Sequence, residues 1–166
     1  MDTVAFYTIV AGLSFTLLGL WWVACQSNKR WLREATGRRM AYVVSLHFIL
    51  PGAMSLLSLV APETPLFWRL TFMLAGAVGA VGAGLTAATL RLHGAGVGRI
   101  RALQWVAVPL YLIVAGTAAS PDLVRSANIG LEPLQVEGIM LTLLVLLGTQ
   151  CAWIVTFTQD EQAERD

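Results

Sequence analysis

The stretch Ala75–Thr89, with the sequence AGAVGAVGAGLTAAT, is the part of the chain that decides the fold. It contains four glycines and six alanines and no charged residue. In water each glycine would weaken a helix by about 1 kcal/mol relative to alanine. In a lipid bilayer the backbone must satisfy its own hydrogen bonds, so a helix forms despite its glycines. The stretch therefore predicts a transmembrane helix.

The side chains of this stretch predict how the helix packs. Its bulky residues, Val78, Val81 and Leu85, recur at helical spacing and form one narrow apolar stripe. Small residues follow the other faces in two ladders, one of Gly76, Ala80, Gly84 and Ala88 and the other of Gly79, Ala83 and Ala87. Small residues let helices approach closely inside a membrane. We therefore expect this helix to lie at the centre of a bundle and to touch neighbours on several sides.

The composition of the whole chain places it in the membrane class. Of its 166 residues 57% are hydrophobic and only 13% are charged, and the mean hydropathy is +0.69. Soluble domains carry about 25% charged residues, so the shortfall is large enough to decide the class. The two cysteines, Cys25 and Cys151, are too few for a disulfide framework.

Five apolar runs are long enough to cross a hydrocarbon core of about 30 Å. They occupy residues 4–25, 40–60, 66–90, 102–119 and 134–157. We expect the first run to be a retained helix, because no basic segment precedes it and no small-residue cleavage site follows it. The prediction is an all-α integral membrane bundle of five transmembrane helices in a single domain, residues 1–166.

Positive charge gathers in two of the connecting segments. The first segment carries Lys29, Arg30, Arg33, Arg38 and Arg39, and the second, 91–101, carries three arginines. Because cytoplasmic loops are rich in Lys and Arg, we expect the N-terminus outside and the C-terminus in the cytoplasm. The five basic residues of the first segment either set this topology alone or also contact anionic lipids or a partner. The arginine-rich composition is typical of GC-rich bacteria, so we expect a multi-pass protein of the bacterial cytoplasmic (inner) membrane.

His47 is an ionisable side chain deep inside a predicted span. At 1.5 Å per residue it lies about 10 Å from the inner end of its helix, and Gln150 lies at the same depth in the fifth span. Because buried polar groups in lipid need partners, we expect a His47–Gln150 contact or a shared polar pocket. Such a contact either joins two helices, contributing roughly 0.6–2 kcal/mol, or forms a site that senses protons or a solute.

The fifth span carries a stripe of small or hydroxylated residues at helical spacing: Gln135, Gly138, Thr142, Val145, Thr149, Ala152 and Thr156. Close helix packing, for example between subunits, is one explanation. The alternative is the hydrated lining of a pore in a homo-oligomer, with Thr142 and Thr149 in its wall. Glu132 or Glu137 would then stand at the outer mouth, where carboxylates attract cations. Carboxylates near a helix start are also ordinary partners of the helix dipole.

Motifs of catalysis and cofactor binding are missing from the sequence. It has no G-x-S-x-G elbow, no P-loop and no dinucleotide fingerprint in a suitable setting, and too few candidate ligands for a metal site. We therefore expect no cofactor, no metal and no nucleic-acid partner. The predicted function is a non-enzymatic membrane subunit that self-associates or joins a complex, in one version forming a small-ion pathway. The alternatives are a small-solute transporter or channel proper, and a membrane-embedded lipid-modifying enzyme.

Overall fold

The computed structural model describes residues 3–27, 32–60, 64–89, 97–126 and 130–163. Regular structure in these ranges is helical, in the order α1 (Thr3–Ser27), α3 (Ala35–Val60), α4 (Pro65–Thr89), α5 (Val97–Ala119), α6 (Pro121–Ser126) and α7 (Pro133–Ala163). Five of these helices are long and apolar enough to cross a membrane. The prediction of an all-α protein with five such helices is confirmed, and the fold fits a multi-pass membrane protein. Lys29 and Arg30 lie outside the described residues.

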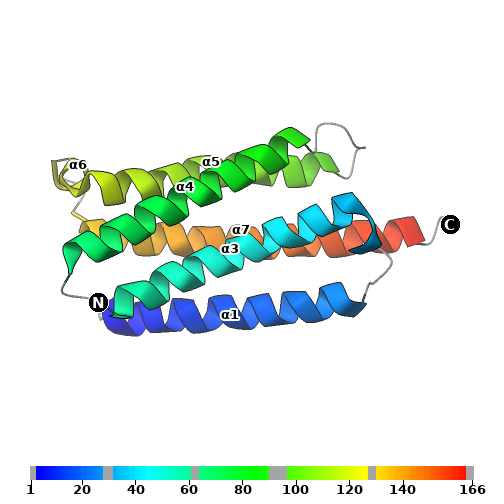
Figure 1. Ribbon diagram of the computed structural model, residues 1–166, viewed down its shortest axis with the longest axis horizontal. Helices are drawn as coiled ribbons and strands as arrows, with labels where there is room; N and C mark the ends of the chain where they lie inside the picture. The colour runs from blue at the N-terminus through cyan, green and yellow to red at the C-terminus, as the bar shows by residue number, and fades with distance from the viewer. Residues whose placement is uncertain (1–2, 28–31, 61–63, 90–96, 127–129, 164–166) are drawn as a thin grey trace.

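The five long helices lie side by side and alternate in direction (Figure 1). We call the end at which α1, α4 and α7 begin the N-terminal end of the bundle, and the opposite end the C-terminal end. The short helix α6 lies at the N-terminal end, between the fourth and the fifth predicted spans. Pro121 is a suitable first helical residue, and Arg125 forms an ion pair with Asp122 at 3.0 Å within this helix.

Contrary to expectation, α4 does not lie at the centre of the bundle. It packs most extensively on α5 and less on α3, and Figure 1 shows α4 and α5 as a pair on one side of the molecule. The side chains of Val78, Val81 and Leu85 are more than half exposed. Lipid accommodates such side chains as well as protein does, so the stripe of bulky residues faces outward and only the smooth side of α4 is covered.

Small residues do bring α4 and α5 close together. A methyl group added at Gly76 would lie 2.8 Å from both the amide nitrogen of Ala115 and the carbonyl oxygen of Tyr111. A methyl group added at Gly79 would enter the ring of Tyr111. Gly79 therefore provides the space that Tyr111 occupies, and the two backbones meet at a distance that only glycine allows.

The helix that touches the largest number of neighbours is α7, which packs on α1, α3, α5 and α6. One row of its buried residues follows steps of three and four, as expected for one side of a helix. This row consists of Glu137, Leu141, Leu144, Gly148, Cys151 and Val155. We call this set the buried face of α7. The central position that the sequence analysis gave to α4 therefore belongs to α7.

We expect Gly79→Ala to destabilise the protein by about 1–3 kcal/mol, because the added methyl group collides with the Tyr111 ring. Gly84→Ala is the matched control on the same helix, since its methyl group would meet no atom closer than Val108 Cγ2 at 3.9 Å. Thermal unfolding in a mild detergent measures both variants. Equal melting temperatures for Gly79→Ala and the wild type would show that close packing of α4 on α5 does not hold the fold.

Candidate functional site

Hydroxyl groups of the long helices mostly bond to their own helix. The hydroxyls that donate to the carbonyl four residues earlier are those of Thr8, Thr16, Ser27, Ser45, Ser58, Thr71, Thr86, Thr142, Thr149 and Thr156. A hydroxyl bonded in this way can lie in hydrocarbon at little cost. The three threonines of the predicted pore stripe belong to this group, so their hydroxyls are satisfied without a pore.

The predicted pore stripe does not share one environment. Gly138 and Val145 are buried inside the bundle, whereas Thr142, Thr149 and Thr156 are exposed on its outer surface. The stripe follows the edge of the buried side of α7: each threonine comes four residues after the preceding stripe residue, which turns it about 40° further around the helix and away from the interior. A single chain therefore turns these threonines away from its own interior.

Seven buried polar atoms in the described part of the chain have no hydrogen-bond partner. They are Ser14 Oγ, His47 Nε2, Ser55 Oγ, Gln104 Oε1, the Tyr111 hydroxyl oxygen and both carboxyl oxygens of Glu137. The six residues that carry them are each at most 1% exposed. Leaving a buried polar group unpaired costs about 1–3 kcal/mol. These atoms therefore mark the places where water, an ion or a ligand would stabilise the bundle.

Glu137 is the most costly of the six residues to bury. It lies one turn into α7, is 0% exposed, and neither carboxyl oxygen accepts a hydrogen bond. Within this chain Glu137 faces the interior of the bundle, because it belongs to the buried face of α7; its predicted place at the outer mouth of a pore between subunits stays a prediction. The reason is helical phase: Glu137 precedes Leu141 by four residues and Leu144 by seven, so it shares the side that they bury.

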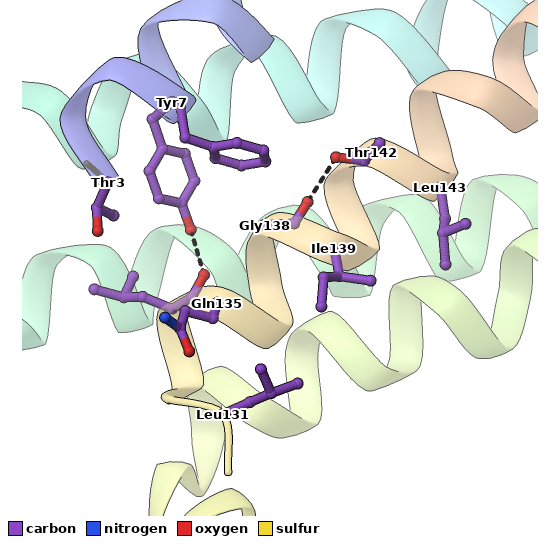
Figure 2. A pocket seen from close by; sticks show the side chains of 10 residues that line it. Thr3, Tyr7, Leu131, Gln135, Gly138, Ile139, Thr142 and Leu143 are labelled. Carbon is purple, nitrogen blue, oxygen red and sulfur yellow. Dashed lines mark hydrogen bonds between the residues drawn. The ribbon is translucent and has the colours of Figure 1, made fainter. Parts of the chain in front are cut away.

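Tyr7 of α1 is a polar neighbour of Glu137. Its hydroxyl donates a hydrogen bond to the backbone carbonyl of Leu134, three residues before Glu137, at 2.9 Å (Figure 2). A phenol has one proton to donate, so Tyr7 cannot also donate to Glu137. Tyr7 therefore joins α1 to α7 and leaves the carboxyl group unpaired.

A groove of about 320 Å³ opens between α1 and α7 beside Tyr7 (Figure 2). Thr3, Phe6 and Tyr7 line it from α1, and the α7 residues in its wall include Gly138 and Thr142. A methyl group added at Gly138 would lie 2.8 Å from the Phe6 ring, so this glycine makes room for the ring. Gly138 lines the groove and directly follows Glu137 on α7, so the groove lies next to the helical turn that carries the buried carboxyl group.

Glu132, the other carboxylate of the predicted pore mouth, is exposed and directly precedes α7. Its backbone N–H donates to Gln135 Oε1 at 3.0 Å, and its carbonyl accepts hydrogen bonds from the backbone amides of Gln135 and Val136. The bond from the Glu132 N–H to the Gln135 side chain is one of the two hydrogen bonds of a capping box. Gln135 therefore serves to begin α7, and Glu132 lies at the surface.

A second polar group lies further along the bundle and consists of His47, Gln104, Tyr111 and Cys151, which we call the His47 cluster. The ring centres of His47 and Tyr111 are 5.8 Å apart. Gln104 Nε2 donates to the Cys151 sulfur at 3.6 Å, and Cys151 lies one turn after Gly148 on the buried face of α7. A methyl group added at Gly148 would lie 2.7 Å from His47 Cβ, so this glycine lets α3 approach α7 at the cluster.

The expected contact between His47 and Gln150 is not formed. Gly148 faces His47, and Gln150 follows two residues later, about 200° further around the helix, where it is exposed. Matching depth suggested the pair, but depth alone does not define which way a side chain faces. The polar neighbours that the sequence analysis missed are Gln104 and Tyr111. Their spacing of seven residues within one apolar run was a signal that they share a helix side.

The described basic residues of the first charged segment, Arg33, Arg38 and Arg39, are exposed at the C-terminal end of the bundle. The Arg38 guanidinium donates to the carbonyl oxygens of Leu32 and Arg33, at 3.3 and 2.7 Å. Arg38 therefore fixes the backbone at the start of α3, while the other two guanidinium groups extend from the surface.

Within the described ranges, no three His, Cys, Asp or Glu side chains gather closely enough to hold a metal ion. Comparison of the chain with known protein families, with curated proteins and with solved structures finds no match in any of the three. The function is therefore inferred from the residues of the two polar sites themselves.

We expect Tyr7→Phe to lower the free energy of unfolding by about 0.5–1.5 kcal/mol, because it removes the buried hydrogen bond to the Leu134 carbonyl. Tyr42→Phe is the control, since Tyr42 is 63% exposed. Unfolding in mixed detergent micelles measures the difference. If both variants unfold alike, the Tyr7 hydroxyl does not stabilise the contact between α1 and α7.

Proposed function

We propose that this protein is a non-enzymatic membrane subunit that passes a small cation through its own helix bundle, with Glu137 as the binding carboxyl group. The observation that carries the proposal is the complete burial of Glu137 with neither oxygen paired. An unpaired buried charge costs several kcal/mol, and ionisable residues inside spanning helices commonly mark ion pathways. A proton or cation held at the carboxyl group removes this cost.

Two buried serines support a path from Glu137 toward the His47 cluster. Ser55 lies on α3, about 12 Å closer to the N-terminal end of the bundle than His47. Ser14 of α1 faces α3 at Gly52, at an intermediate depth. Neither hydroxyl has a partner, unlike the hydroxyls that bond to their own helix. These groups offer polar positions at successive depths between the two sites.

We propose that the N-terminal end of the bundle faces outside and the C-terminal end faces the cytoplasm. Exposed arginines at the C-terminal end, Arg33, Arg38, Arg39 and Arg101, support this orientation through the positive-inside rule. Glu137 would then lie near the outer surface and the His47 cluster nearer the cytoplasm. The proposed location is a bacterial inner membrane, where anionic lipids would be partners of these arginines.

We also propose that the subunit self-associates through the outer side of α7. Thr149 and Gln150 are exposed there, inside the span. The amide of Gln150 both donates and accepts hydrogen bonds, so the same amide of a second copy can satisfy it. Hydrogen bonds between helices in a membrane contribute about 1–2 kcal/mol at most in model peptides. A pore lined by Thr142 and Thr149 would require such an assembly.

Cation flux into proteoliposomes, driven by a potassium diffusion potential, tests the proposed pathway. We expect the protein to raise proton or sodium flux above that of protein-free liposomes, and Glu137→Gln to lower it about tenfold or more, because each 1.4 kcal/mol of lost stabilisation slows a rate about tenfold. Glu132→Gln is the matched control, because Glu132 lies at the surface five residues earlier. Its flux should equal that of the wild type.

The melting temperatures of both variants should match the wild type, since glutamine keeps the shape of the glutamate side chain. Wild-type flux in Glu137→Gln would contradict the role of this carboxyl group. Absence of any protein-dependent cation flux would contradict the pathway itself.

A further inference from the structure

The His47 cluster contains three of the seven unpartnered atoms, and its hydrogen bonds define what each atom needs. His47 Nδ1 lies 2.9 Å from the carbonyl oxygen of Val43. A carbonyl oxygen only accepts hydrogen bonds, so the proton is assigned to Nδ1. The other ring nitrogen, Nε2, then carries a lone pair, which is buried and receives no hydrogen bond.

Gln104 and Tyr111 complete the set of unfilled positions. Gln104 uses Nε2 to donate to Cys151, and its Oε1 accepts nothing. The Tyr111 hydroxyl has a proton to donate and no acceptor in the structure. The cluster therefore has two acceptors without a donor and one donor without an acceptor, on side chains that are at most 1% exposed.

One water molecule has the groups that this set lacks: two O–H donors, one each for His47 Nε2 and Gln104 Oε1, and a lone pair for the proton of the Tyr111 hydroxyl. Buried waters in proteins make about three hydrogen bonds to otherwise unsatisfied groups. We infer that the His47 cluster binds a water molecule and that His47 Nε2 takes up a proton through it. This inference rests on the proposed function and names the proton as the cation that the pathway carries.

The transfer step balances within the cluster. A proton that reaches the bound water forms a hydronium ion, whose O–H bond breaks as an N–H bond forms at His47 Nε2. The products are a neutral water molecule and an imidazolium that still donates from Nδ1 to Val43. Return of the Nε2 proton to the bound water restores the starting state, so the proton transfer balances without an oxidant or a reductant.

The chemistry of the cluster favours a proton over a metal cation. Among the described residues, the ring of Tyr111 on α5 packs against the His47 ring, and Cys151 on α7 accepts from Gln104; neither titratable group of the cluster is a carboxylate. Hard metal cations take six or more oxygen ligands in proteins, with carboxylates prominent among them. The cluster instead offers one ring nitrogen, one amide oxygen and one phenol, which suit a hydrogen-bonded water.

Solid-state NMR of the full chain in lipid bilayers tests the inference. The chain has two histidines, His47 and His93, so ¹⁵N-histidine labelling of the His93→Gln variant reports on His47 alone. We expect Nδ1 to be protonated, Nε2 to show the shift of a hydrogen-bonded lone pair, and magnetisation to pass from water to the ring. Gln104→Leu and Tyr111→Phe each remove one partner of the water and should weaken this transfer severalfold.

Ser45→Ala is the matched control, because Ser45 is buried on the same helix but its hydroxyl already bonds to the Ala41 carbonyl. Its water transfer should equal that of the starting variant. If Gln104→Leu does not fold, Tyr111→Phe carries the test, since it removes a single oxygen atom. A ring protonated at Nε2 instead of Nδ1, or a ring without water transfer, would overturn the inference.

Flux measurements keep this inference separable from the proposed function. His47→Phe should abolish proton flux, and the wild type should carry protons rather than sodium. Sodium flux that depends on Glu137, without proton flux, would overturn the inference and leave the proposed function intact. Hydration of His47 in a protein that carries neither cation would overturn the proposed function, and with it the assignment of the proton as cargo.

Discussion

Four helix pairs of this bundle meet where an aromatic ring of one helix packs on a glycine of the other. The ring–glycine pairs are Tyr111 on Gly79, Phe48 on Gly148, Phe6 on Gly138 and Phe15 on Gly52. Lipid tails are as apolar as leucine, so moving apolar side chains from lipid into the bundle gains little free energy. Close van der Waals packing between helices therefore has to stabilise the bundle. A ring seated on bare backbone makes many contacts at once. Each of these contacts joins one helix pair: α4 with α5, α3 with α7, α1 with α7, and α1 with α3.

The same contacts position the polar side chains. The ring of Tyr111 packs on Gly79, and Gly148 allows the backbone of α3 at His47 to approach α7 closely. Helices held this closely leave little freedom for side chains to turn outward, so the polar atoms stay inside even where the bundle offers no partner. The interactions that stabilise the fold therefore also create the unpaired groups of the candidate sites, which is the trade-off expected of functional residues.

The sequence predicted much of the fold, since apolar runs of span length are a strong signal. It did not predict α6, because six residues are too few for a periodic pattern. The sequence pattern wrongly predicted a central position for α4. Small residues indicate that other helices can approach a helix closely, but they do not indicate how many helices do so. His47 and Gln150 were paired because they lie at the same depth in their spans, without regard to the side of the helix on which each residue lies. By contrast, the spacing of Glu137 from Leu141 and Leu144 already shows that the three residues share one side of the helix, which is the side that is buried.

One helix links the two polar sites. Glu137 and Cys151 both belong to the buried face of α7, and 14 residues separate them by about 21 Å. Between them this face presents Leu141 and Leu144, both 0% exposed, so α7 itself interposes an apolar barrier. In the proposed pathway this barrier would direct a cation toward the unpaired hydroxyls of Ser14 on α1 and Ser55 on α3. Such a pathway would require polar groups of three helices, with α7 holding its two ends at a fixed separation.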